Sequence, residues 1–255
     1  MRKPYTIREF EYNPTSGGIK VMYSLYGALL LKGEEVMANA IFPPEIDAIG
    51  IYPEISQGNE LQTKHVVRYI LNKPGVMTQN GVPGPTTFAP TDCLFTFSKM
   101  FMDLPDDRCM FLPAINTEVF YDRKLKRTKN AVFVGKGRAT QPHIGDVFID
   151  RTTARDQEAL AVLLNECQVL NTYDPVSAMT EIARLCGCRV NYLAPDYTKK
   201  DYLLYEPGIN GMSFPLEGDE IAPLDTKAFL GHYRALQARF FDVLLPNFIK
   251  ITQNL

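Results

Sequence analysis

The hydrophobic positions of the chain change period several times, and each change predicts a new secondary-structure element. Residues 5–12 alternate apolar and polar side chains, which is the period of a β-strand. Turn residues fill 13–18, and apolar residues then recur at helical spacing from Ile19 until a glycine stop at Gly33. Residues 35–42 have the pattern of a second strand. The order of strand, glycine-rich loop, helix and strand is typical of an α/β unit.

The rest of the first half consists of shorter and more mixed segments. Residues 46–52 form an apolar run that suits a strand. Asn59 is a suitable helix cap, and the apolar residues that follow it as far as Leu71 predict a helix. Residues 76–90 are rich in Gly, Pro and Thr, and predict a long loop of the kind that often carries function. Two further strands are expected at 94–97 and 110–112.

The α/β pattern begins again after a polar, charged segment at 121–130, which we interpret as a linker. Strands are expected at 131–134, 147–149, 168–173 and 189–193, and helices at 153–164 and 175–186. A long helix is expected at 226–243, with Pro246 ending or kinking it. Because strands that alternate with helices indicate a mostly parallel sheet, the sequence predicts an α/β protein built from two similar halves.

Composition and charge narrow the class of protein. The chain has 255 residues, of which 45% are hydrophobic and 22% charged, and this composition is that of a folded globular protein rather than a disordered chain. A net charge of −2 gives no overall attraction to nucleic acid or to an anionic membrane. No apolar run approaches the roughly 18 residues that a membrane-spanning helix needs, and residues 1–10 lack the apolar centre of a signal peptide. We therefore expect a cytoplasmic protein without a transmembrane segment.

The cysteines and histidines do not predict a metal site. The five cysteines are odd in number and lie among apolar neighbours, which suits reduced, buried thiols better than a disulfide framework. Cys186 and Cys188 form one candidate ligand pair, whereas a tetrahedral zinc site needs two pairs. The three histidines lie far apart in the sequence. We therefore expect no bound metal.

The segment from Tyr173 to Glu181 carries the most informative chemistry. A strand is expected to end near Tyr173, Asp174 is a good N-cap, and a proline follows it at the first helical position. Such a helix N-terminus at the carboxyl edge of a parallel sheet favours a phosphate group. Glu181 lies two helical turns after Asp174 on nearly the same face, where it suits the hydroxyls of a ribose. The alternative is an ordinary capped amphipathic helix on which Glu181 is merely solvated.

Two glycine-containing segments favour the same kind of ligand. Gly135–Arg138 (Gly-Lys-Gly-Arg) directly follows a predicted strand, and its glycines and cationic side chains suit a diphosphate. It is neither a Walker loop nor the dinucleotide fingerprint, and a basic turn is the alternative interpretation. Ser16, Gly17 and Gly18 before the first predicted helix follow the same logic. Together, the three segments indicate a nucleotide bound between the two halves.

These segments resemble those of the GT-B class of glycosyltransferases, particularly its small bacterial and viral members. The resemblance lies in 13–18, in 52–75, in Gly135-Lys136-Gly137 and in 173–190, in the order of the family. It implies that Lys136 contacts a diphosphate and that Glu181 binds the nucleotide ribose. The common donor motif has two glutamates eight positions apart. Here the first falls on Tyr173, with Asp174 beside it, so the sugar-contacting role of that first acid stays open.

The resemblance implies two Rossmann-like domains facing a cleft. It places an acceptor-side domain at 1–125, a donor domain at 126–225, and a helix at 226–255 that returns to the first domain. The implied activity is metal-independent transfer of a sugar from a UDP- or GDP-linked donor, used as co-substrate without another cofactor, to an acceptor hydroxyl. No catalytic residue is assigned. The donor-binding residues expected are Gly17, Gly18, Lys136, Arg138, Tyr173, Asp174, Ser177 and Glu181.

Other functions on the same scaffold remain open at this point. A sugar-nucleotide epimerase would need acid and base residues of which the sequence offers few, and a non-catalytic sugar-nucleotide-binding or assembly protein would suit the departure at Tyr173. The acceptor is a polysaccharide, a small molecule, a protein or a modified base of viral DNA. The last of these is the one way in which nucleic acid would be a partner. The sequence does not predict the stereochemical outcome or the oligomeric state.

Overall fold

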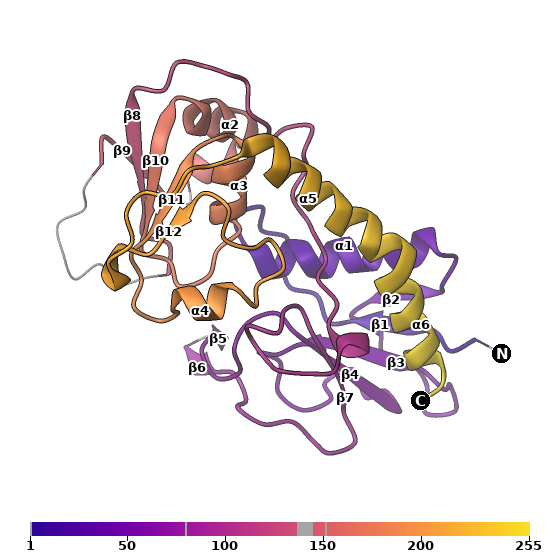
Figure 1. The fold of residues 1–255 in the computed structure, drawn as a ribbon. Coiled ribbons are helices and arrows are strands. Elements are labelled where there is room, and N and C mark those ends of the chain that lie inside the picture. Colours follow the sequence, from indigo (N-terminus) through magenta and orange to yellow (C-terminus); the bar gives the residue numbers. More distant parts are fainter. Residues whose placement is uncertain (1, 80, 137–144, 151) are drawn as a thin grey trace. The chain divides into compact units, whose positions relative to one another are not determined.

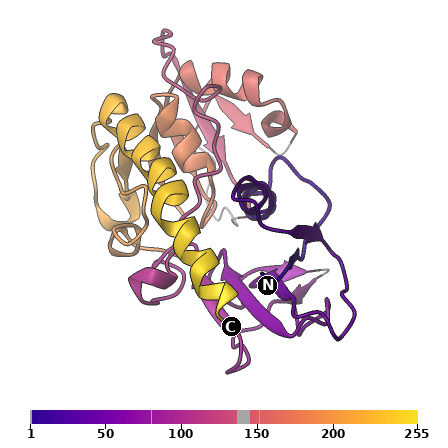
Figure 2. The same cartoon turned by 90° about the vertical axis from the view of Figure 1, so that its right-hand side faces the viewer.

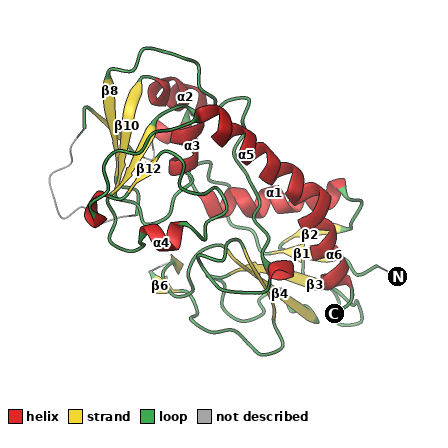
Figure 3. Cartoon of the chain, viewed as in Figure 1, coloured by secondary structure: helices red, strands yellow, loops and turns green. Residues whose placement is uncertain are grey.

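The computed structural model describes residues 2–79, 81–136, 145–150 and 152–255, which fold into two compact units. Unit 1 comprises Met1–Ala114 and Leu236–Leu255, and unit 2 comprises Ile115–Ala235. Each unit contains its own five-stranded sheet, and all neighbouring strands in these two sheets are parallel (Figures 1 and 3). The predicted α/β class, with two Rossmann-like sheets, is therefore confirmed. Among the described residues, no helix is both long and apolar enough to cross a membrane.

The sheet of unit 1 has the strand order β2-β1-β3-β4-β7. Its strands are β1 (Tyr5–Ile7), β2 (Val36–Ala38), β3 (Ile49–Pro53), β4 (His65–Ile70) and β7 (Cys93–Thr96). Beside this sheet stands a short antiparallel pair, β5 (Thr78–Gln79) and β6 (Val82–Pro83). A 3₁₀ turn at Asp106–Arg108 follows β7. The strand expected at 110–112 does not form, and the pairing there is an isolated bridge between Thr96 and the preceding Cys109.

Helix α1 (Gly17–Leu31) connects β1 to β2, as the apolar spacing predicts. Ser16 caps it by accepting a hydrogen bond from the Ile19 amide at 3.5 Å, and Gly33 follows its end with a φ of +76°. The buried face consists of Val21, Met22, Leu25, Ala28 and Leu29. Burial of this stripe, rather than helix propensity in a glycine-containing segment, holds the helix in place.

The helix expected after Asn59 is wrong, because this segment forms β4. The run from Val66 to Ile70 is β-branched and aromatic apart from Arg68, and such residues favour a strand. Arg68 is 4% exposed and is satisfied inside the unit by Asp92, whose carboxylate lies 2.8 Å from its Nε. The Asn59 side chain does not cap a helix but bonds to Tyr52 and to the backbone around Thr63.

The last helix of the chain covers the sheet of unit 1. In α6 (Leu245–Gln253), Phe248 packs on the rings of Tyr5 and Phe95, and the Thr252 hydroxyl lies 2.7 Å from that of Tyr5. Both termini lie in this unit (Figure 2). There the Lys3 amide donates to the Gln253 side chain at 2.9 Å.

Pro246 neither ends the C-terminal helical run nor breaks it. A π-helical turn (Phe240–Leu244) joins α5 (Thr226–Arg239) to α6, so the run extends beyond the predicted 226–243. Proline lacks the N–H that would donate to the preceding turn of an α-helix. The π-helical turn before Pro246 changes the hydrogen-bond register there and so accommodates the missing donor.

Unit 2 has the strand order β12-β11-β10-β8-β9. Its strands are β8 (Lys129–Phe133), β9 (Val147–Ile149), β10 (Cys167–Thr172), β11 (Arg189–Tyr192) and β12 (Met212–Ser213). Its helices are α2 (Gln157–Asn165), α3 (Met179–Leu185), α4 (Lys199–Tyr202) and the first part of α5, with 3₁₀ turns at Thr153–Arg155 and Pro215–Glu217. The helix expected from 153 begins instead after Asp156, which caps α2 by accepting from the Ala159 amide at 3.0 Å.

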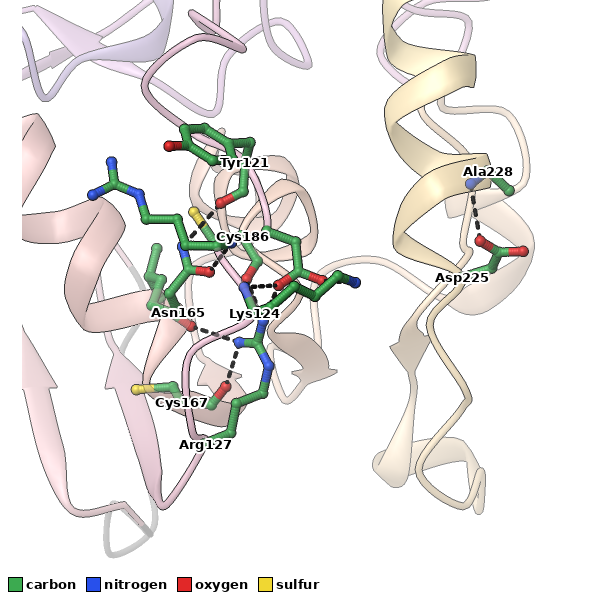
Figure 4. A network of polar contacts seen from close by, with 11 residues as sticks. Tyr121, Lys124, Arg127, Asn165, Cys167, Cys186, Asp225 and Ala228 are labelled. Atoms are coloured by element: carbon green, nitrogen blue, oxygen red, sulfur yellow. Dashed lines mark hydrogen bonds and ion pairs between the residues drawn. The ribbon is translucent and has the colours of Figure 1, made fainter.

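The polar segment at 121–130 is tied into unit 2 by Arg127 (Figure 4). Its guanidinium donates to three carbonyls, those of Leu164 at 3.2 Å, Cys167 at 3.1 Å and Cys186 at 2.7 Å. It also pairs with Asp122 at 2.8 Å. Arg127 therefore supplies a cation to carbonyls at the C-terminal ends of α2 and α3, where the helix dipole favours positive charge.

Candidate functional site

The strand order of unit 2 places a topological switch point between β8 and β10. Numbered along the chain within the unit, the strands run 2-1-3-4-5, with β8 first and β10 third. The connections from these two neighbours leave the sheet in opposite directions, and open parallel sheets bind ligands at the carboxyl edge of this point. Gly135 and Lys136 follow β8, and Tyr173 and Asp174 follow β10. The structure therefore brings together two segments that the sequence separates by nearly forty residues.

Asp174 joins the two segments through its carboxylate. Oδ2 accepts the Lys136 amide at 3.1 Å, and Oδ1 accepts the Val176 amide at 3.2 Å. The Lys136 ammonium donates to the Val176 carbonyl at 2.8 Å and lies 3.7 Å from Oδ1 of Asp174. Gly135 has a φ of +55°, and a Cβ built there would overlap the Asp174 carboxylate. A glycine is needed here both for the left-handed backbone and for the close approach of the two loops.

The two charged side chains at the switch point differ in their exposure to solvent. The Asp174 side chain is 4% exposed, whereas that of Lys136 is 37% exposed. Burial raises the pKa of the Asp174 carboxyl, and the neighbouring Lys136 acts in the opposite direction. A lysine ammonium has three donor positions, and the described contacts with Val176 and Asp174 leave its exposed side open. Lys136 therefore presents positive charge to solvent while the acid below it is enclosed.

The helix after β10 begins later than the sequence predicts. Helix α3 starts at Met179, and its cap position, Ala178, makes no side-chain capping bond. Asp174 is therefore not the N-cap: its carboxylate accepts the Lys136 amide from the loop after β8 and the Val176 amide from its own loop. The Ser177 hydroxyl accepts the amide of Met179, the first residue of α3, at 3.1 Å. Residues 174–178 form a loop at the switch point and not the first turn of a helix.

Two tyrosines that sequence reasoning missed hold this loop. The hydroxyls of Tyr192 and Tyr202 both donate to the Pro175 carbonyl, at 3.0 and 3.1 Å. The two rings meet edge to face with centroids 4.8 Å apart. The one available signal was the concentration of tyrosines between 192 and 205, which carries no information on what they contact.

Glu181 lies inside unit 2. Its predicted place at the surface, either facing a ribose or in solvent, is wrong. The residue is 2% exposed, and its Oε2 accepts the Thr180 hydroxyl at 3.0 Å. Among the described residues, Oε1 of Glu181 has no hydrogen-bond partner. The pKa of Tyr205 is raised, first by burial and then by the negative charge of Glu181. In this conformation Glu181 offers no surface to a ligand, and its contact with a ribose stays a prediction.

The remaining expected site residues belong to different elements of the fold. Tyr173 is 9% exposed, and its amide donates to the Phe133 carbonyl at 2.9 Å, which extends the pairing of β10 with β8. Gly17 and Gly18 form the first turn of α1 in unit 1. Arg138 lies outside the described residues. Within the parts of the chain that the structure describes, no three or more His, Cys, Asp or Glu side chains are grouped to hold a metal ion.

Comparison with known proteins does not assign the chain to a family. No protein-family model matches the sequence, and no curated protein is significantly similar to it. The chemistry open to the chain therefore follows from the switch-point geometry of unit 2 and from the residues that lie there.

Proposed function

We propose that the chain is a metal-independent glycosyltransferase whose donor, a nucleoside-diphosphate sugar, binds to unit 2 at the carboxyl ends of β8 and β10. The single observation that supports this most is the joining of the Gly135–Lys136 turn to Asp174 at the topological switch point. Ligands of open parallel sheets bind at this place, and an exposed lysine there suits a diphosphate.

The proposed contacts divide by charge. Lys136 neutralises the diphosphate from its exposed side. Asp174 has no proposed contact with the phosphates, because its negative charge would repel them. Its role is to hold the loops after β8 and β10 together. The Ser177 hydroxyl accepts from the Met179 amide, which leaves its proton to donate to a phosphate or sugar oxygen. Because α3 is short and begins after this loop, helix-dipole stabilisation has no part in the proposal.

The proposed reaction moves the glycosyl group between two oxygens. The bond from the anomeric carbon to the diphosphate oxygen breaks, and the electron pair stays on the leaving nucleoside diphosphate. A bond forms from the acceptor oxygen to the anomeric carbon, and the acceptor's hydroxyl proton passes to a base that we do not assign. Lys136 stabilises the charge that develops on the leaving group, which is the role of a fixed cation in transition-state stabilisation.

A non-catalytic sugar-nucleotide-binding protein is the second candidate. The tyrosine at position 173, where the GT-B donor motif has an acid, favours it. The burial of Glu181 does not separate the two candidates, because a ribose contact would serve binding in both. Both candidates require Lys136 to bind the diphosphate, so they differ only in turnover.

A turnover assay separates the two candidates. The purified chain is incubated with UDP- and GDP-linked sugars, and released UDP or GDP is measured with water or added sugars as acceptors. Lys136→Ala is compared with Lys199→Ala, a matched control because Lys199 is also paired with an acid of unit 2 and its side chain is 41% exposed. Release that is lost in Lys136→Ala and retained in Lys199→Ala supports the transferase. Binding without release supports the non-catalytic protein, and absence of both contradicts the donor site.

A further inference from the structure

The peptide group between Pro175 and Val176 is hydrogen-bonded on both of its sides. Its carbonyl oxygen accepts the hydroxyls of Tyr192 and Tyr202, at 3.0 and 3.1 Å. Its N–H, which is the amide of Val176, donates to Oδ1 of Asp174 at 3.2 Å. A carbonyl oxygen has two lone pairs and a peptide nitrogen has one hydrogen, so the bonding capacity of this group is fully used. Because a peptide group is planar, the three bonds together fix the orientation of the whole plane.

The two hydroxyls are enclosed donors and not surface groups. Tyr192 and Tyr202 are each 1% exposed, and each ring lies with its centroid 5.5 Å from that of Phe214. Burial raises the pKa of both tyrosines, so each hydroxyl keeps its proton at neutral pH and donates to the carbonyl. Tyr192 is the last residue of β11, and Tyr202 is the last residue of α4. Two elements other than β8 and β10 therefore hold this peptide group.

The orientation of the peptide group bears on the lysine of the switch point. The next carbonyl along the chain is that of Val176, which accepts the Lys136 ammonium at 2.8 Å. The amides of Val176 and Lys136 donate to the two oxygens of one carboxylate, that of Asp174. Hydrogen bonds in series polarise one another, so the donors on the Pro175 carbonyl strengthen the bond from the Val176 amide. The two hydroxyls thus act on the lysine through one peptide group and one carboxylate.

Another buried tyrosine of unit 2 shows what a hydroxyl without this connection looks like. Tyr233 is also 1% exposed, and its hydroxyl accepts the Ile115 amide at 3.2 Å. In the described part of the chain, that hydroxyl has no hydrogen bond with residues 174–178 or with Lys136. Removal of the Tyr233 hydroxyl therefore measures the effect of losing a buried backbone contact alone.

We propose that Tyr192 and Tyr202 are positioning residues for Lys136. They fix the peptide group that follows Pro175, and with it the carbonyl and the carboxylate that hold the lysine. The lysine then meets its ligand already oriented, so less conformational freedom is lost on binding. This inference rests on the proposed function in one respect, namely that the anion bound by Lys136 is the diphosphate of a nucleotide.

Hydrogen exchange of the full-length, ¹⁵N-labelled chain tests the positioning without any nucleotide. The test variants are Tyr192→Phe and Tyr202→Phe, each of which removes one hydroxyl and keeps the ring, and Tyr233→Phe is the matched control. The amides of Val176 and Lys136 are expected to exchange about threefold to tenfold faster in the test variants than in the control, because the bonds that close this loop are weakened. Equal exchange of these two amides in all three variants overturns the proposal.

Calorimetric titration with UDP and GDP tests the consequence for binding. Each test variant is expected to bind nucleotide about threefold more weakly or worse, whereas Tyr233→Phe binds as the wild type does. A merely structural role would lower the urea midpoint of all three variants and leave the affinity of the folded protein unchanged.

The outcomes separate this inference from the function on which it rests. Unchanged affinity in both test variants, or an equal loss of affinity in Tyr233→Phe, overturns the proposal. If the wild type binds neither nucleotide, the proposed function fails, and the exchange rates alone decide whether the tyrosines position Lys136. If one test variant does not fold, the other supplies the same two measurements, since each removes a single donor from the same carbonyl.

Discussion

The Lys136 amide donates to the Asp174 carboxylate at 3.1 Å, so the loops that follow two neighbouring strands of unit 2 are held as one structure. This relationship depends on the residue before the lysine. Gly135 has a positive φ and no side chain, which lets its backbone lie against Asp174. The switch point of unit 2 is thus defined by a glycine, an exposed cation and an enclosed acid.

Replacement of Gly135 by alanine is expected to destabilise unit 2 and to weaken nucleotide binding. The left-handed backbone alone should cost about 1–2 kcal/mol, and displacement of the Asp174 carboxylate should add to this. Urea unfolding followed by circular dichroism measures the change. Gly27→Ala is the control, since Gly27 lies inside α1 with no atom within 4 Å of an added Cβ. That substitution should instead stabilise the protein by about 0.5–1 kcal/mol, and equal destabilisation by both would contradict the account of Gly135.

Loss of Arg127 is expected to destabilise unit 2 much more than loss of Lys124, although both pair with Asp122. The Arg127 side chain is 21% exposed and also donates to three carbonyls, whereas that of Lys124 is 81% exposed. Arg127→Met should lower the free energy of unfolding by about 2–4 kcal/mol, because buried carbonyls and Asp122 lose their partner. Lys124→Met should change it little. Similar losses for the two variants in urea titrations would show that the carbonyl contacts do not matter.

The burial of Glu9 should appear in the pH dependence of stability. Burial raises the pKa of its carboxyl above the ordinary value of 4.5, so the folded protein binds this proton more tightly than the unfolded chain. The stability associated with Glu9 is therefore fully present below pH 4.5 and is lost as the pH rises through the folded-state pKa. Glu9→Gln lacks this titration. Its free energy of unfolding, measured relative to the wild type, should rise from acidic to neutral pH, and a constant difference would contradict an enclosed carboxyl.

Periodicity predicted those parts of the fold that local pattern determines. Helix α1 and strands β8 to β11 follow runs of apolar residues bounded by turn residues, and the structure has them within a few residues of the expected positions. The segment that forms β4 was misread, because a buried Arg68 gave a strand the polar interruption of an amphipathic helix. The ion pair with Asp92 explains how a strand can bury Arg68. Asp92 lies 24 residues further along the chain, so a local pattern does not predict this pair.

The candidate site was predicted in part. The sequence identified Gly135, Lys136 and Asp174, but it assigned Asp174 to a helix cap, since Asp-Pro ahead of an apolar run is a usual helix start. The carboxylate instead accepts the Lys136 amide from the loop after another strand, a long-range contact that local spacing does not contain. Likewise, the burial of Glu181 follows from where α3 begins and from the packing around Tyr205, neither of which a motif reveals.

Calorimetric titration shows directly whether Lys136 binds a diphosphate at the switch point of unit 2, as we propose. UDP and GDP are titrated into the wild-type chain, Lys136→Ala and Lys199→Ala, with circular dichroism confirming that each variant is folded. Loss of an exposed, charge-assisted contact should weaken binding by about tenfold or more in Lys136→Ala. Lys199→Ala should bind as the wild type does. Equal affinity of Lys136→Ala and wild type, or no binding of either nucleotide to the wild type, would contradict the proposed donor site.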